Sequence, residues 1–116
     1  MNYRIRKISE LIKKDLAYLI QYKLKDPRIK KIIIIQSVIV SKDIKYAEIY
    51  WTIMNENKKN KIYAKILKLA SGYLRSKLYR NIKIHQIPKL RFHYDSSINR
   101  SYKLNKLINK IIGENI

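Results

Sequence analysis

The residues of this chain that could do chemistry are mainly cations. Lys and Arg number 27 against 8 Asp and Glu, which gives a formal net charge of +19 over 116 residues. Such an excess indicates a polyanionic partner, because ammonium and guanidinium groups bind phosphate oxygens. Ile, Lys, Asn and Tyr are all abundant, and A/T-rich codons favour this set, so codon bias also explains part of the lysine content. The total charge still favours a nucleic acid as partner.

Residues suited to catalysis or metal binding are scarce. The absence of cysteine excludes disulfides, thiolate catalysis and Cys-ligated metals. His85 and His93 lie on different segments, and only Asp95 stands near them as a third ligand. The sequence carries no glycine-rich phosphate loop, no Ser–His–acid order and no plausible carboxylate pair. It therefore predicts no catalytic residue, no metal site, no cofactor and no small-molecule substrate.

The elements that would position the cations follow from hydrophobic periodicity. Residues 2–24 repeat apolar side chains at helical spacing, and Pro27 requires that helix to stop. Residues 29–40 are continuously β-branched, which predicts a strand buried on much of both faces. Residues 45–54 alternate, with Ala47, Ile49, Trp51 and Ile53 on the apolar side. Together the two strands predict an antiparallel hairpin.

A long helix over about 59–80 contains Gly72, one of only two glycines in the chain. A glycine inside a helix costs roughly 0.8–1.0 kcal/mol relative to alanine, so this position calls for a packing, bending or binding reason. Its apolar residues step by four, a spacing that drifts about 40° per step around a straight helix. A bend at Gly72 would return them to the core. The stripe consists of Ile62, Ile66, Ala70, Leu74 and Leu78.

Residues 88–95 alternate as a third strand, and residues 97–116 predict a C-terminal helical tail that ends near Gly113. No linker or repeat divides the chain, so one domain is expected over residues 1–116. The longest apolar run, residues 32–35, is too short to cross a membrane, and the amino terminus lacks the apolar core of a secretion signal. A cytoplasmic monomer is expected.

The predicted order αββααβ is that of type II KH-like domains, an α+β fold with helices on one face of a three-stranded sheet. Four stretches, in order, resemble the ribosome-binding factor A family: "DPRI", "SKDIKYAEIYW", "ASGYLRSKL" and "IPKLRFHYDSS". The resemblance implies that Ala70, Ser71 and Gly72 form an alanine-x-glycine kink between two helices. His85 and Ser101 depart from the family pattern, which usually has arginine and glycine near these positions.

The resemblance also implies a function. The family binds the immature small (30S) ribosomal subunit and assists maturation of the 5′ end of its ribosomal RNA, especially in the cold, without catalysis. A generic KH-like RNA-binding module or ribosomal protein is the alternative. A small nuclease or RNA-modifying enzyme is a third possibility, which turnover of precursor ribosomal RNA would reveal.

All candidate RNA-binding cations except Arg28 lie after the kink and around the third strand, and Arg75, Arg80 and Arg91 are expected to face solvent. Arg28 follows Pro27 and could pair with Asp26 or contact RNA, and pairing is the simpler interpretation. Among the tyrosines, Tyr46, Tyr50, Tyr73 and Tyr94 could stack on bases or simply pack, whereas Trp51 belongs to the core. The candidate RNA contacts are Arg28, Arg75, Arg80, Lys83, Lys89 and Arg91.

Overall fold

The computed structural model describes residues 2–55, 59–84 and 86–95. Helix α1 (Tyr3–Tyr18) continues into a π-helical turn, η1 (Leu19–Lys23), and is followed by strands β1 (Ile33–Val40) and β2 (Tyr46–Ile53). Helix α2 (Asn60–Asn81) then leads to strand β3 (Lys89–Tyr94). The predicted α+β class with a three-stranded sheet is confirmed. The predicted C-terminal helix, His85 and Ser101 lie outside the described residues.

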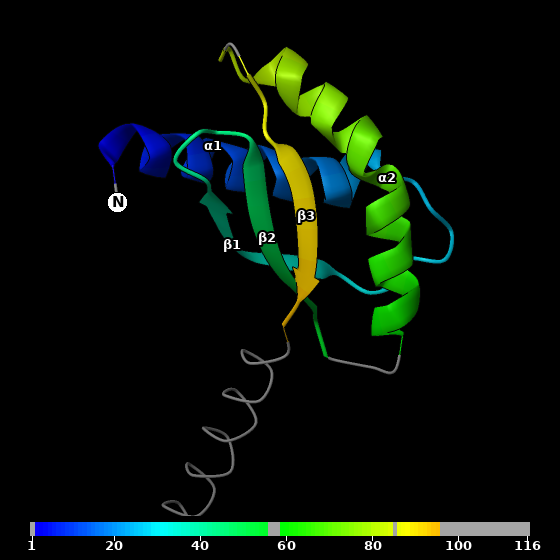
Figure 1. Ribbon diagram of the computed structural model, residues 1–116. Coiled ribbons are helices and arrows are strands. Elements are labelled where there is room, and N and C mark those ends of the chain that lie inside the picture. Colours follow the sequence, from blue (N-terminus) through cyan, green and yellow to red (C-terminus); the bar gives the residue numbers. More distant parts are fainter. Residues whose placement is uncertain (1, 56–58, 85, 96–116) are drawn as a thin grey trace, which may run out of the picture.

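The sheet is mixed, with strand order β1-β2-β3. β1 pairs with β2 in antiparallel fashion, as predicted, and β2 pairs with β3 in parallel fashion. Parallel pairing requires a crossover, which α2 supplies. Figure 1 shows α1 passing behind the sheet and α2 standing alongside β3. α1 therefore packs against β1 and α2 against β3, and the two helices contact each other.

The core forms where α1, α2 and β2 meet. Its fully buried side chains include Ile12, Leu16, Ile49, Trp51 and Leu67. The predicted apolar side of β2 is confirmed, because Ala47, Ile49, Trp51 and Ile53 are all buried. Trp51 Nε1 has no hydrogen-bond partner within the described structure, and its ring meets Tyr94 edge-on at 5.0 Å.

The interpretation of β1 as a strand buried on much of both faces was wrong. Ile35, Val38 and Val40 are buried, but Ile39 is 46% exposed. The register shifts between Ile35 and Ser37, which marks a β-bulge. β1 thus has one core face, whereas its other face is half-buried at Ile34 and exposed at Ile39, so its continuous apolar run does not reflect full burial of both.

The first helix ends as predicted, before Pro27, but its last turn is wider than an α-helical turn. The Leu24 amide donates to the Leu19 carbonyl at 2.8 Å, five residues back. This turn lets Leu19, Ile20 and Leu24 pack toward the core while Tyr18 and Tyr22 stay exposed.

The predicted pair of helices is one unbroken helix, α2, so the expected division at Ala70, Ser71 and Gly72 was wrong in that respect. Figure 1 shows that its axis changes direction about halfway along. The predicted apolar stripe is confirmed at Ile66, Leu74 and Leu78, which are buried, and at Ala70, which packs against the core. Its first position was wrong: Ile62 is 46% exposed, and Tyr63 is fully buried in its place. The Tyr63 hydroxyl accepts hydrogen bonds from the amides of Lys30 and Lys31, at 2.9 and 3.0 Å.

Neither described helix has the length and apolar character needed to cross a bilayer. Within the same residues, no three histidine or acidic side chains gather closely enough to hold a metal ion.

Candidate nucleic-acid interface

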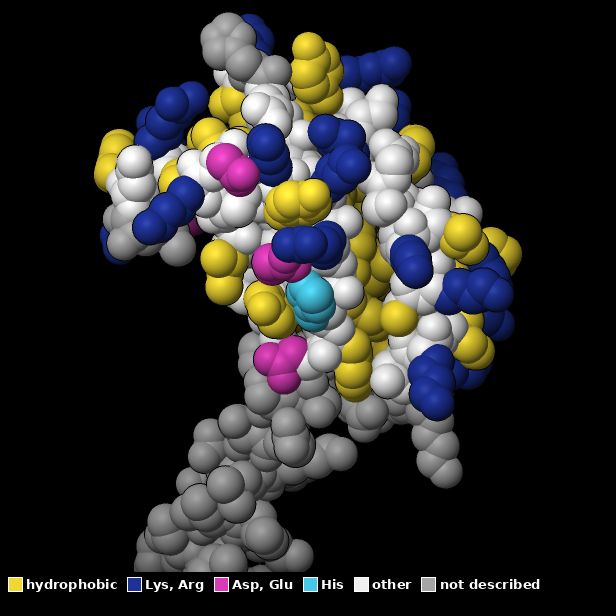
Figure 2. Space-filling view, in the orientation of Figure 1, with side chains coloured by type: hydrophobic (Ala, Val, Ile, Leu, Met, Phe, Trp, Pro, Cys, Tyr) yellow, Lys and Arg dark blue, Asp and Glu magenta, His cyan; other side chains and the backbone are white. Residues whose placement is uncertain are grey.

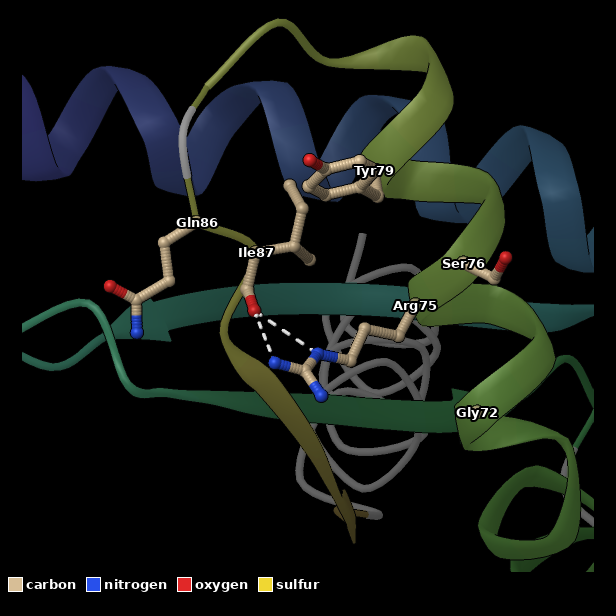
Figure 3. Close-up of a pocket in the computed structure, with 6 residues that line it drawn as sticks. All are labelled: Gly72, Arg75, Ser76, Tyr79, Gln86 and Ile87. Atoms are coloured by element: carbon tan, nitrogen blue, oxygen red, sulfur yellow. Dashed lines mark hydrogen bonds between the residues drawn. The ribbon is translucent and has the colours of Figure 1, made fainter.

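The second half of α2 and the segment before β3 enclose a pocket of about 430 Å³. Figure 3 shows its lining residues, with the helix on one side and the extended chain on the other. The pocket is open, so a ligand larger than its volume could enter it in part. Its lining consists of Gly72, Arg75, Ser76, Tyr79, Gln86 and Ile87.

Gly72 leaves the backbone of α2 bare at this pocket. A Cβ atom added to Gly72 would meet no other atom within 4 Å, and no glycine in the described residues has a positive φ. Neither packing within the chain nor backbone geometry therefore requires glycine here. A bare helix backbone does allow a partner to approach closely. The change in the helix axis and access for a partner remain the two reasons for this glycine.

Arg75 does not point freely into solvent as expected, because it is half-buried. Its Nε and Nη2 donate to the carbonyl oxygen of Ile87 at 3.1 and 2.9 Å, across the pocket (Figure 3). The guanidinium thus joins α2 to the segment that leads into β3. A group that holds a backbone carbonyl keeps only part of its donor capacity for a phosphate.

A second groove, of about 450 Å³, runs between the first half of α2 and β3. Ala64, Leu90 and Phe92 give it an apolar floor, and Lys65 and Lys68 are exposed on its helix side. Figure 2 shows this apolar strip between β3 and α2 with blue cationic side chains on both sides. Arg91 and Ser71 complete the lining. Apolar surface suits base faces, and a cationic rim suits phosphates.

Arg91 occupies the opposite rim of this groove and is partly engaged within the protein. It forms an ion pair with Glu48 and lies over the Tyr46 ring, 4.1 Å from its centroid. His93 Nε2 lies 2.5 Å from the other oxygen of Glu48. Burial raises the pKa of Glu48, but the hydrogen bonds from His93 and Arg91 outweigh that effect and lower it. Glu48 therefore stays ionised between two partners.

The remaining predicted contacts line neither groove. Arg80 and Lys83 are exposed near the end of α2, and Lys89 is exposed at the start of β3. Arg28 lies in the turn before β1 and pairs with Asp26 through two hydrogen bonds, of 3.0 and 2.7 Å, which confirms the simpler interpretation of that residue. Of the predicted site residues, Arg75 and Arg91 therefore line one groove each, and the others line neither.

Lys65 and Lys68 were missed from the sequence, as were the contributions of Tyr79 and Gln86. Lys65 and Lys68 are three residues apart, a spacing that places two side chains next to each other on the surface of a helix. They follow directly after Ala64 and Leu67 on α2. That signal was available, but the sequence did not show that this side of α2 faces β3.

The mixed sheet, the two helices packed on it and the cation-rimmed grooves beside α2 define a small, basic α+β domain. A comparison with protein families matches residues 4–108 to the family described as "Ribosome-binding factor A". The chain belongs to the ribosome-binding factor A family.

Individual relatives agree with this assignment. A ribosome-binding factor A of Hahella chejuensis is 43% identical over 113 residues, covering 92% of this chain and 83% of the relative. The crystal structure of the ribosome-binding factor A of Thermus thermophilus has a TM-score of 0.68 at 24% identity, covering 78% of this chain and 94% of that one, and supports the fold alone. Thermus thermophilus coordinates fitted into a cryo-electron microscopy map of a 30S complex have a TM-score of 0.63 at 26% identity. The match covers 76% of this chain and 91% of that one.

Proposed function

We propose that this protein binds the immature small ribosomal subunit through its ribosomal RNA and assists maturation of the RNA 5′ end without catalysing a reaction. Membership of the ribosome-binding factor A family supports this proposal, as does the similarity to a Thermus thermophilus factor fitted into a 30S complex. The net charge of +19 is suited to an RNA partner.

The observation that carries the proposal is the arrangement of the two grooves along α2. One offers an apolar floor between Lys65 and Lys68 on one side and Arg91 on the other. The next offers the bare backbone of Gly72. An RNA strand that runs along α2 could place its phosphates against the cations of the first groove and approach the helix backbone closely at Gly72 in the second. We assign both grooves to the RNA interface.

Sedimentation tests the choice of partner. Lysates of the parent organism would be separated on sucrose gradients, and the protein would be followed by immunodetection. We expect it to travel with small-subunit precursors and to be nearly absent from polysomes. Exclusive association with polysomes or with free messenger RNA would contradict the proposal and would favour a general RNA-binding module.

Mapping of the ribosomal RNA 5′ end tests the role. Cells depleted of the protein should accumulate small-subunit RNA with an unprocessed 5′ end, and the defect should be larger in the cold. Purified protein incubated with the same precursor should leave it intact, because we propose binding without cleavage. Normal 5′ ends in depleted cells at low temperature would refute the assigned role.

A further inference from the structure

The face of the sheet that looks toward the viewer in Figure 2 carries two cross-strand pairs of the same kind. In the first pair, the guanidinium of Arg91 lies over the ring of Tyr46. In the second pair, the rings of Tyr50 and His93 stack with centroids 5.1 Å apart and planes 28° apart. In each pair β2 supplies the tyrosine and the edge strand β3 supplies a flat, nitrogen-rich group. We call these four residues the aromatic face.

Glu48 joins the two pairs. It lies between the tyrosines on β2, opposite Arg91 in the register, and its two oxygens contact Arg91 and His93 separately. This arrangement holds both flat groups in place before any ligand arrives. It also offsets the negative charge of Glu48, which would otherwise repel a phosphate.

The geometry of β3 repeats the flat surface at a fixed step. Arg91 and His93 are two residues apart, so they project from the same side of the strand about 7 Å from each other. Their side chains remain 52% and 44% exposed although each rests on a tyrosine. Two neighbouring flat surfaces of this kind fit two neighbouring bases of an extended single strand.

We propose that the aromatic face stacks two consecutive bases of single-stranded RNA and so extends the RNA interface from the groove across the edge of β3. This inference rests on the proposed function, because it takes RNA as the partner. Arg91 lines the α2–β3 groove and also belongs to the aromatic face, so one strand can pass from the first surface to the second. A duplex cannot bind in this way, since its bases already stack within the helix.

Charge favours a nucleic acid over a protein as the occupant. Lys89 is exposed at the start of β3, in register with Tyr46, and Lys65 and Lys68 stand beyond the neighbouring groove. A strand lying across this region would place its phosphates near these cations while its bases lie on flat groups. Stacking on Arg and aromatic planes is tolerant of base identity, so the segment recognised would be unpaired rather than of a particular sequence.

The test compares two probes that differ only in their bases. A fluorescently labelled oligoadenylate offers bases and phosphates, and an abasic strand of the same length offers the phosphates alone. Binding would be measured by anisotropy for the parent protein and for His93→Ala and Arg91→Lys. The lysine variant keeps the positive charge and removes the flat guanidinium. Tyr3→Ala, which removes a tyrosine that is 76% exposed on α1, is the matched control.

Each stacked base is worth about fivefold to a hundredfold in affinity. Both variants should therefore lose at least about fivefold for oligoadenylate and almost nothing for the abasic strand, whereas Tyr3→Ala should match the parent. A loss that is equal for the two probes would overturn the proposal, because it would reveal a phosphate contact only. Unchanged oligoadenylate binding by both variants would overturn it as well.

Parallel sedimentation of the parent protein with small-subunit precursors separates the two proposals. If the parent protein sediments with the precursors but the variants distinguish the two probes as well as the parent does, the role of the aromatic face is refuted and the proposed function stands. If the parent protein does not sediment with the precursors but the variants lose affinity for oligoadenylate alone, the proposed partner is refuted and the stacking surface stands.

Discussion

The Asp26–Arg28 pair fixes the turn that ends the first helical segment, and it makes a prediction about pH. The hydrogen bonds from the Arg28 side chain and backbone lower the pKa of Asp26 from 3.8 to about 2. A carboxylate whose pKa is lower in the folded state stabilises the fold above the unfolded pKa, and the stabilisation is lost as pH falls through the folded pKa. Asp26→Asn should therefore lower the melting temperature at neutral pH, by an amount that shrinks between about pH 4 and pH 2.

Thermal melts of both proteins across this pH range check the prediction. Glu10→Gln, which removes an exposed carboxylate from α1, is the control and should show no comparable convergence. A difference for Asp26→Asn that persists unchanged at pH 2 would show that the substitution acts through the turn rather than through charge.

Arg75 makes a different prediction because it holds a backbone carbonyl. Arg75→Leu removes both donors to Ile87 and should lower the free energy of unfolding by about 1–2 kcal/mol. Arg80→Leu, at an exposed position in the same helix, should change it by less than about 0.5 kcal/mol. Urea unfolding followed by the fluorescence of Trp51, which is buried in the core, measures both values. Equal stability of the two variants would mean that the Arg75 contact contributes nothing in solution.

At the scale of the element, α2 makes the prediction for Gly72. Gly72→Ala should raise the free energy of unfolding by up to about 1 kcal/mol, because alanine favours the helix and its Cβ has free space. The same methyl group would stand between the helix backbone and an RNA strand, so binding to small-subunit precursors should weaken. Leu69→Ala, at an exposed position of α2, is the control for changes to the helix surface. Full binding by Gly72→Ala would remove close approach as the reason for this glycine.

The strands and helices differ in how far the sequence could predict them. The apolar side of β2 was predicted correctly, because the side chains of that strand alternate between two environments, although Thr52 on the other side is buried as well. β1 was not, since Ile39 is as apolar as Ile35 although only Ile35 is buried. The stripe on α2 was predicted correctly except at its first position, because Tyr63 and Ile62 are both apolar enough for the core. The hydrogen bonds of the Tyr63 hydroxyl, which fix the choice, join residues more than thirty positions apart.

The candidate site was predictable only to the level of residue type. Arg75 and Arg91 were predicted as RNA contacts because they follow the kink and lie in the third strand, and each lines a different groove. Their partners could not be predicted, because Ile87 and Glu48 reach them through tertiary packing. Lys65 and Lys68 show the reverse case: two ordinary helix lysines gain a candidate role only from the strand that packs beside them.

For the molecule as a whole, the prediction concerns salt. Lys65→Gln combined with Lys68→Gln should weaken binding to small-subunit precursors and reduce the slope of log affinity against log salt by about 1.4, since each phosphate contact to a single strand contributes about 0.7. Lys7→Gln combined with Lys14→Gln removes the same charge from exposed positions on α1. Affinity measured over a salt series should separate the two pairs. Equal slopes for both double variants would show that charge acts through the whole molecule and not through the groove.

The parallel pairing of β3 has a consequence for synthesis. Residues 54–88 separate β2 from β3, so α1, β1 and β2 are synthesised before the last strand exists. Throughout that interval the central strand presents an unpaired edge beside Ile49 and Trp51, the kind of edge that recruits strands from other chains. The unfinished chain is therefore open to aggregation along this edge of β2, and the pairing of β3 with β2 covers the edge.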